Sequence, residues 1–187
     1  MYENEIDKVK TCIGDKRPCM IAIDGRCGSG KSTFGSLLAE KLNADLFHMD
    51  DFFLRPEQRT EERYATPGEN VDHERVEEVL ALWWKQEMFS YRKFDCGTMS
   101  LADETIVVPK QIAVVEGTYS MHKDLRKFYS LTIFMDIDHD LQQKRILSRS
   151  NEEVLAVFNE RWIPLEELYF RSLDVQNLCQ LQISATN

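Results

Sequence analysis

The sequence has no apolar run close to the roughly 20 residues that a membrane-spanning helix requires. It also has no C-x-x-C pair, and its five cysteines are widely spaced and odd in number. These absences argue against a membrane anchor, a disulfide framework and a cysteine-based zinc site. The first ten residues, MYENEIDKVK, are charged and lack the apolar stretch of a signal peptide. We therefore expect a cytoplasmic protein with reduced thiols and no membrane partner.

Basic charge is scarce as well. The chain carries 23 lysines and arginines against 32 acidic residues, which gives a formal net charge of −9. A general nucleic-acid binder presents a basic surface, so we expect no nucleic acid partner. An anionic ligand must instead be held by a local group of cations. The four histidines are scattered and form no H-E-x-x-H metal motif. The sequence leaves the oligomeric state open, and a homo-oligomer is compatible with it.

No repeat, low-complexity tract or long linker divides the 187 residues, so we expect one α/β domain spanning 1–187. Short apolar runs predict buried strands at 18–24, 45–49, 111–115, 131–137 and 179–184. Amphipathic or polar helical patterns cover 31–42, 72–87, 139–149, 152–160 and a segment that Pro164 opens. Strands that alternate with helices predict a mostly parallel sheet covered on both faces. Residues 91–108 differ, and their pattern indicates a two-stranded excursion.

One motif stands out between the first predicted strand and the first predicted helix. Residues 25–32, GRCGSGKS, fit the phosphate-binding pattern G-x-x-x-x-G-K-[ST] in the context that the motif requires. Glycines let backbone N–H groups curl around phosphate oxygens, and the helix N-terminus favours the same anions. Lys31 would reach the β- and γ-phosphates, and the Ser32 hydroxyl would ligate Mg²⁺. The predicted ATP-binding residues of the loop are Gly25, Arg26, Cys27, Gly28, Ser29, Gly30, Lys31, Ser32 and Thr33.

Cys27 lies inside this loop, close to a predicted helix N-terminus. That position could lower the pKa of its thiol, in which case oxidation would block ATP binding.

Acidic residues follow the predicted strands, at the edge where open α/β sheets bind ligands. A kinase needs one carboxylate to take the proton of the acceptor hydroxyl and another to hold Mg²⁺. Asp50 is the candidate base, with a place on the metal side as well, and Glu116 is the candidate metal ligand. A turn pair for Asp50 and Asp51, or a helix start at Glu116, would explain the same residues structurally. Asp24, just before the loop, stays unassigned between a structural cap and a metal-side group.

With these residues in view, the chain resembles the uridine kinase family, which also includes phosphoribulokinase-like enzymes. The matching segments are IAIDGRCGSGKST at 21–33, HMDDFF at 48–53, NVDHERV at 70–76, YRKFDC at 91–96, VVEGTYSMH at 114–122 and FMDIDHDLQQKRILSR at 134–149. The resemblance implies a three-layer P-loop nucleoside kinase fold, with ATP and Mg²⁺ as cofactors and a small nucleoside-like acceptor. It also implies a β excursion over the acceptor and a helical lid at about 142–161.

The resemblance assigns roles to individual residues. It makes Asp50 the base toward a ribose 5′-hydroxyl, points to Asp72 for the ribose hydroxyls and places Glu116 on the metal side. Phe94 and Asp95 fall on the excursion that covers the base. Further candidates lie elsewhere in the chain: the lid residues Arg145 and Arg149, with Arg149 the first choice for a catalytic phosphate contact, and Phe53, which could wall the acceptor pocket or simply pack in the core.

The sequence departs from the family pattern where the base would be recognised. Family members that act on uridine and cytidine carry an aromatic residue and a histidine there, whereas this chain has CGTM at 96–99. The acceptor therefore stays open among uridine or cytidine, nicotinamide riboside, a pantothenate-like compound and a sugar phosphate. A nucleotide-binding regulatory protein without turnover is the alternative of another class, although a guanine-reading N-K-x-D is absent.

Overall fold

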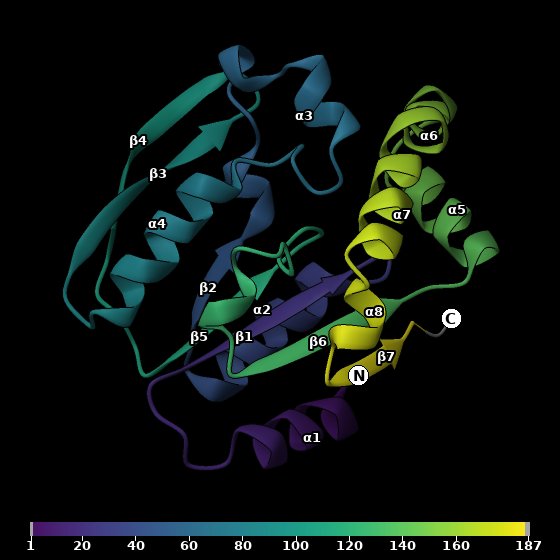
Figure 1. Cartoon of the computed structure of the whole chain (residues 1–187). Coiled ribbons are helices and arrows are strands. Elements are labelled where there is room, and N and C mark those ends of the chain that lie inside the picture. The colour runs from purple at the N-terminus through teal and green to yellow at the C-terminus, as the bar shows by residue number, and fades with distance from the viewer. Residues whose placement is uncertain (1, 186–187) are drawn as a thin grey trace.

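A five-stranded parallel sheet forms the centre of the protein (Figure 1). In spatial order its strands are β2 (Asp45–His48), β5 (Ile112–Glu116), β1 (Cys19–Gly25), β6 (Leu131–Asp136) and β7 (Leu181–Ser184). The computed structural model describes residues 2–185. Each neighbouring pair of strands runs parallel, and β1 lies in the middle between β5 and β6. The predicted parallel α/β sheet is confirmed, with the residues after β1, β2 and β5 gathered at one edge.

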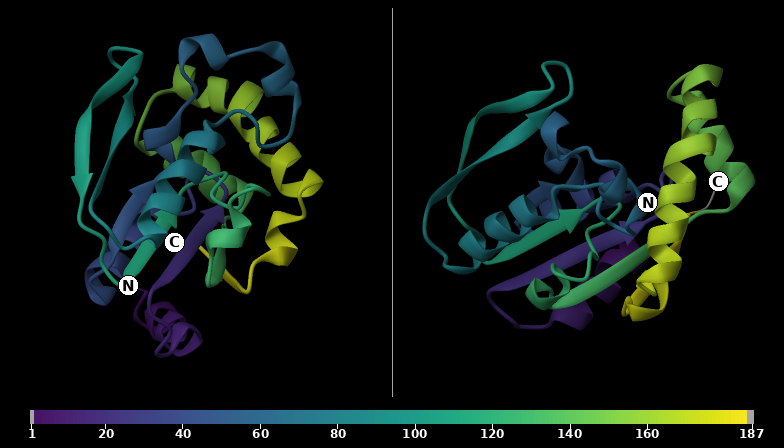
Figure 2. Two further views of the ribbon diagram at one scale, coloured as in Figure 1. Left: turned by 60° about the vertical axis from the view of Figure 1, so that its left-hand side comes forward. Right: turned by 45° about the horizontal axis from the view of Figure 1, so that its top comes forward.

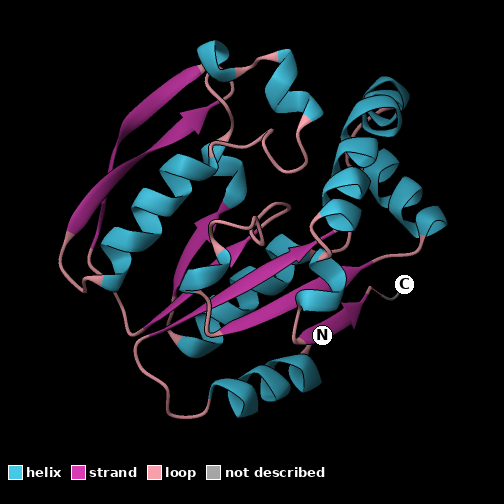
Figure 3. Ribbon diagram, viewed as in Figure 1, coloured by secondary structure: helices cyan, strands magenta, loops and turns pink. Residues whose placement is uncertain are grey.

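Helices cover both faces of this sheet (Figures 2 and 3). On one face lie α1 (Glu3–Ile13) and α2 (Lys31–Leu42), and on the other α4 (His73–Trp84), α7 (Ile163–Ser172) and α8 (Val175–Leu178). Alternation along β1 explains the two layers, because successive side chains of a strand point to opposite faces. Ile21 and Ile23 pack in the α1–α2 cluster, whereas Met20 packs in the α4 cluster.

Helix α4 forms where the sequence predicts it. The carboxylate of Asp72 caps its first turn by accepting a hydrogen bond from the N–H of Arg75. Val76, Leu80 and Trp83, spaced at helical intervals, are fully buried against the sheet. The indole N–H of Trp83 donates to the carboxylate of Asp45, the first residue of β2. This hydrogen bond fixes the C-terminal end of α4 to the edge strand of the sheet.

The predicted excursion is an antiparallel hairpin, β3 (Phe89–Asp95) and β4 (Ser100–Val107), which stands apart from the main sheet (Figure 2). A register shift between Arg92 and Phe94 interrupts the pairing. Tyr91 anchors the hairpin by stacking on Phe52 with ring centroids 5.7 Å apart. Phe52 belongs to the short 3₁₀ turn η1 (Met49–Phe52), which follows β2. The hairpin therefore packs against the turn that carries Asp50.

The remaining elements form the helical region after β6 and the connections near α4. The region comprises α5 (His139–Ser148), α6 (Glu152–Val157), a π-helical turn (Phe158–Trp162) and α7. The connecting elements are α3 (Glu61–Ala65) and the 3₁₀ turns η2 (Pro56–Gln58) and η3 (Arg126–Phe128). Among the helices that the structure describes, none has both the length and the apolarity needed to cross a membrane.

One helix at the N-terminus is not predicted from the sequence, and one near the C-terminus is. The charged N-terminal segment forms helix α1, because Ile6, Val9 and Ile13 give a narrow apolar stripe that is buried. The helix that Pro164 is predicted to open is confirmed as α7, and helical structure reaches it from α6 through the π-helical turn. Proline is tolerated there because it lies in the first turn of α7.

Candidate active site

The phosphate-binding motif forms the connection between β1 and α2. Gly25 has a φ of +139°, and a Cβ there would lie 2.0 Å from the carbonyl oxygen of Met135, so only glycine fits. Gly30 has a φ of +97° and directly precedes Lys31, the first residue of α2. The side chain of Ser29 is fully buried. This loop therefore directs backbone N–H groups and a helix N-terminus toward the sheet edge, as anion binding requires.

Lys31 lies at the heart of this loop with only 8% of its surface exposed. Its ammonium group donates to the carbonyl oxygens of Gly25, at 2.7 Å, and Arg26, at 2.9 Å. The loop thus holds its own cation, and that charge is available to an entering phosphate. Ser32 and Thr33, by contrast, are exposed at the start of α2.

Glu116, the last residue of β5, joins the loop to two neighbouring strands. One carboxylate oxygen accepts a hydrogen bond from the Ser32 hydroxyl at 3.1 Å, and the other contacts Nδ1 of His48 at 2.5 Å. That hydrogen bond raises the pKa of His48. Glu116 is 3% exposed. A hydroxyl and a buried carboxylate are the hard oxygen donors that suit Mg²⁺, so these residues fit the ion that the sequence predicts.

Asp50 lies in η1, two residues beyond His48, the last residue of β2. Its carboxylate has no hydrogen-bond or ion-pair partner between residues 2 and 185, whereas Asp51 is paired with Lys93 of the hairpin at 2.9 Å. Although Asp50 is exposed to solvent, partial desolvation and the charge of Glu116 raise its pKa, while Lys31 opposes that rise. Because the charge of Lys31 acts on Asp50, the predicted base lies within electrostatic range of the predicted phosphate loop.

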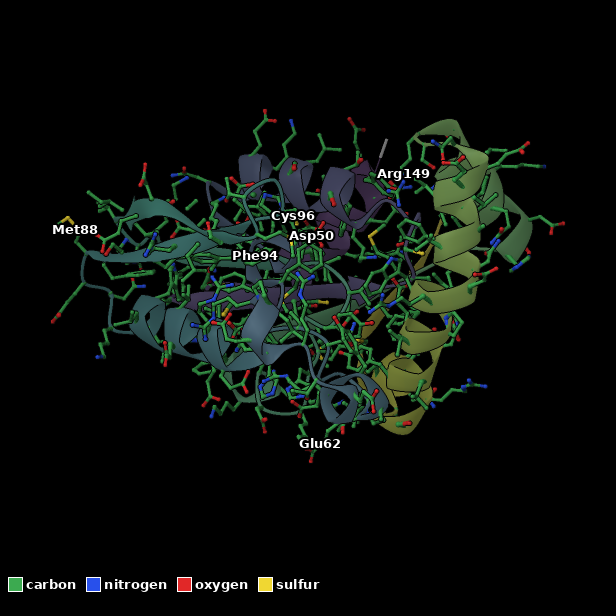
Figure 4. All side chains as sticks on the ribbon, turned by 90° about the horizontal axis from the view of Figure 1, so that it is seen from above. Asp50, Glu62, Met88, Phe94, Cys96 and Arg149 are labelled. Carbon is green, nitrogen blue, oxygen red and sulfur yellow. The ribbon has the colours of Figure 1, made fainter. Side chains whose placement is uncertain are left out.

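The predicted acceptor residues come from the hairpin, the residue after η1 and the start of α4. Phe94 of β3 is 6% exposed and lies under the guanidinium group of Arg59, and Phe53 is 39% exposed. In the view of Figure 4, Phe94 and Asp50 occupy the middle of the molecule, consistent with the packing of β3 on η1. Asp72 is 2% exposed, and the backbone and side chain of Arg75 engage its carboxylate. Its structural role as a helix cap is therefore clear.

Asp95 has a local role in the hairpin turn. Its side chain is exposed, and the carboxylate accepts a 2.7 Å hydrogen bond from the N–H of Gly97. This bond lowers the pKa of Asp95. An interaction with the acceptor stays a prediction for this residue.

Two predicted lid arginines lie on α5 or at its end, beside the loop. Nη1 of Arg145 donates to the carbonyl oxygen of Gly28 at 3.1 Å. Arg149 is exposed (Figure 4). Its guanidinium group lies over the ring of Phe158 at 5.8 Å and acts electrostatically on Cys27. Both charges are therefore on the phosphate side of the site, on a different element from the loop itself.

Sequence reasoning missed the acidic pair on α7 that grips the loop. Glu166 accepts a 3.0 Å hydrogen bond from the N–H of Cys27, and Glu167 receives Nε and Nη2 of Arg26 at 2.6 and 3.1 Å. Arg26 also donates to Asp136 at the end of β6. The partners of each α7 contact are 139 to 141 residues apart in the chain, so no local spacing could reveal them.

The structure also resolves the assignment of Asp24. One carboxylate oxygen accepts from the N–H of Gly25, and the other accepts from the N–H of Met121 at 2.8 Å and the hydroxyl of Tyr169 at 2.7 Å. Asp24 is fully buried, and burial raises its pKa. With these donors in place, its role is to fasten the loop to the sheet and to α7.

The hypothesis of a reactive Cys27 is wrong. Burial and the neighbouring charge of Glu166 raise the pKa of the Cys27 thiol to about 12, opposite to the direction expected at a helix N-terminus. The buried thiol is therefore poorly suited to oxidation control.

A strand–loop–helix anion site with an internal lysine, flanked by a carboxylate of η1 and one of β5 at the same sheet edge, is typical of a P-loop phosphotransferase. The model of the phosphoribulokinase / uridine kinase family matches residues 20–153. A uridine kinase of Clostridium tetani is 31% identical over 150 residues, covering 74% of this chain and 70% of the relative. A uridine kinase of Clostridium perfringens is 28% identical over 170 residues, covering 86% and 78%.

The chain belongs to the phosphoribulokinase / uridine kinase family and is a kinase with an alcohol acceptor. A solved structure from Bacillus stearothermophilus, described as "a Possible Uridine Kinase", has a similar fold, with a TM-score of 0.73 and 18% identity. The similarity covers 96% of this chain and 97% of the solved chain. The family implies ATP as the phosphoryl donor and typically Mg²⁺.

Proposed function

We propose that this protein transfers the γ-phosphoryl group of ATP to the 5′-hydroxyl of a nucleoside, with uridine and cytidine as the first acceptors to test. We place the reaction in the cytoplasm, which keeps the five free cysteines reduced. The proposal rests on one observation above the rest. Asp50 has a raised pKa, no partner among the described residues, and the charges of Lys31 and Glu116 close enough to act on it.

The residues divide the reaction between them. Asp50 accepts the proton of the acceptor hydroxyl as the new oxygen–phosphorus bond forms and the bond to the leaving ADP breaks. Lys31 and the N–H groups of the loop hold the phosphates, and Arg145 and Arg149 approach them from α5. Ser32 and Glu116 would hold Mg²⁺, which would neutralise phosphate charge. The helical region at 142–161 acts as a lid that excludes water.

The residues around η1 and the hairpin favour binding of a small hydroxyl compound between these two elements. Phe53 and Phe94 offer aromatic surface, and Asp72 orders the start of α4 beside them. The stretch at 96–99 is an exposed hairpin turn without an aromatic ring or a histidine. Recognition of a pyrimidine edge would therefore have to come from other residues, and this favours testing acceptors beyond the pyrimidine nucleosides.

An acceptor panel tests the proposal. ADP formation is measured with Mg-ATP and uridine, cytidine, nicotinamide riboside, pantothenate or ribose 5-phosphate, and mass spectrometry identifies the product. We expect 5′-phosphorylation of a nucleoside, and we expect Lys31→Ala to abolish it because the loop loses its central cation. Turnover with another acceptor would replace the nucleoside assignment. Mg-ATP binding without turnover on any acceptor would indicate a regulatory protein.

A further inference from the structure

A second cluster of potential ligand atoms lies outside the phosphate site. Glu69 comes from the loop before α4, His73 from its first turn and His122 from the loop after β5. Each residue offers one ligand atom, and these atoms all lie within 4.8 Å of one another. The two imidazole rings are stacked, with centroids 4.0 Å apart. Histidines that are 49 positions apart in the sequence thus meet in the fold, which the absence of a local metal motif could not reveal.

Both rings are buried and incompletely satisfied. The side chain of His122 is 0% exposed and that of His73 is 9% exposed. Nε2 of His122 and Nδ1 of His73 have no hydrogen-bond partner in the described part of the chain, whereas Nε2 of His73 contacts a carboxylate oxygen of Glu69 at 2.9 Å. Such orphaned buried polar atoms are uncommon in folded proteins and call for an unseen partner. Nε2 of His122 points to that partner, because it lies 3.7 Å from Glu69, beyond hydrogen-bond distance.

The surroundings resemble the outer shell of a metal site. A carboxylate oxygen of Asp124 lies 3.7 Å from Nδ1 of both His73 and His122, on the side opposite Glu69. This distance is beyond a direct hydrogen bond, and a carboxylate that closed it would orient the metal-bound histidines. Gly68 has a φ of +86°, and a Cβ there would lie 2.9 Å from the ring of His122. Only glycine therefore allows the loop before α4 to pack this closely against the ring.

We propose that Glu69, His73 and His122 bind a divalent transition metal of the Zn²⁺ class. Two imidazoles and one carboxylate form a donor set typical of zinc, and a water molecule would complete four-coordination. The rings are inclined by only 24°, so binding must open the stack until both Nε2 atoms converge on the ion. The site is distinct from the Mg²⁺ residues Ser32 and Glu116, whose donors are oxygens alone.

Metal binding at this position would hold the acceptor side together. The ion would link the loop at 66–72 to the loop at 117–125. The first loop ends at Asp72, and the second carries Tyr119, whose side chain interacts with Asn70. Cross-linking two loops that otherwise meet only through side chains favours the folded protein, because the ion binds the assembled site better than the unfolded chain.

Cobalt binding to the full-length, chelator-treated protein tests the proposal without any activity assay. Co²⁺ is titrated by visible absorption, and we expect one ion per chain, bands typical of a four-coordinate site and displacement by Zn²⁺. Glu69→Gln and His122→Asn should each weaken binding by more than about 10-fold, the lower limit for changes in outer-shell partners alone. Asp124→Asn should weaken it about 10-fold. His139→Gln, at an exposed histidine, is the matched control and should change nothing.

Three results would overturn the proposal. The first is the absence of four-coordinate bands at saturating Co²⁺. The second is a sulfur-to-cobalt charge-transfer band, which would assign the ion to a cysteine. The third is unchanged affinity in Glu69→Gln, a side chain that is 20% exposed and tolerates replacement more readily than buried His122. Circular dichroism checks that each variant is folded. If His122→Asn does not fold, the result for Glu69→Gln decides the outcome.

Discussion

At the scale of single residues, Asp50 lies between opposing electrostatic influences. Desolvation and the carboxylate of Glu116 raise its pKa, while the positive charges of Lys31 and His48 lower it. The net rise makes Asp50 a better proton acceptor than an ordinary aspartate, which suits a general base. Its neighbour Asp51 is instead neutralised by Lys93. Adjacent carboxylates thus have different chemistry because their partners differ.

Replacing Asp50 separates chemistry from nucleotide binding. Asp50→Asn should lower kcat by at least about 100-fold, the scale of general-base catalysis, because the amide cannot take the proton. Mg-ATP affinity, measured by calorimetry, should change little, since the loop is intact. Asp51→Asn is the matched control and should retain far more activity. Near-normal turnover in Asp50→Asn would remove Asp50 from the role of base.

The raised pKa of Asp50 also predicts the acid limb of the pH profile. The base works only when it is ionised, so kcat/KM should fall as the pH drops through the pKa of Asp50 in the free enzyme. Because that pKa is above the ordinary value of 3.8, the fall should begin at a higher pH than for an aspartate with an ordinary pKa. Initial rates at constant ionic strength measure it. A rate that stays constant down to pH 4 would contradict the prediction.

At the scale of elements, α7 acts as a clamp on the phosphate loop. Glu166 and Glu167, neighbours on this helix, hold Cys27 and Arg26, neighbours in the loop. The helical region that contains the predicted lid continues directly into α7. Movement of that region would therefore displace the loop through the contacts of Glu166 and Glu167.

Weakening the clamp should affect nucleotide binding more than chemistry. Glu167→Gln replaces a charge-assisted, two-point contact with Arg26, which is worth about 1.5–3 kcal/mol. We expect KM for ATP to rise roughly 10-fold while kcat stays within about 2-fold, since 1.4 kcal/mol corresponds to a factor of 10. Glu153→Gln, an exposed glutamate of α6, serves as control. A drop in kcat at unchanged KM would argue against a role in holding the loop.

At the scale of the whole molecule, Asp24 connects the three parts that build the site. Its carboxylate joins the end of β1, the loop after β5 and Tyr169 of α7. Tyr169 is itself fully buried in the cluster that packs α7 and α8 on the sheet. The stability of the fold and the geometry of the phosphate site are therefore linked through one buried carboxylate.

Removing one hydroxyl tests this link. Tyr169→Phe deletes a donor to buried Asp24 and should lower the free energy of unfolding by about 1–3 kcal/mol, the cost of an unsatisfied buried partner. Urea denaturation measures the change as a lower midpoint at constant slope. Tyr64→Phe, in α3 and only partly buried, should have little effect. Equal midpoints for wild type and Tyr169→Phe would show that Asp24 does not depend on this bond.

Local pattern in the sequence was enough to predict most of the framework and the centre of the candidate site. The strands, α2, α4 and the hairpin follow from periodicity. Residues 25–32 follow from a motif whose spacing places its glycines, lysine and hydroxyl where a phosphate binds. Asp50 and Glu116 could be chosen because parallel strands end at a common edge. These features depend on residues close together in the chain, where side-chain order determines conformation.

Only the tertiary structure decided which distant groups meet and what their surroundings do to them. It paired Glu166 with Cys27, stacked His73 on His122 and enclosed Asp24 between three donors. It also reversed the expected direction of the pKa of Cys27, because burial outweighs the helix N-terminus there. Burial and long-range partnership arise from packing of the whole chain, so no short stretch of sequence carries them.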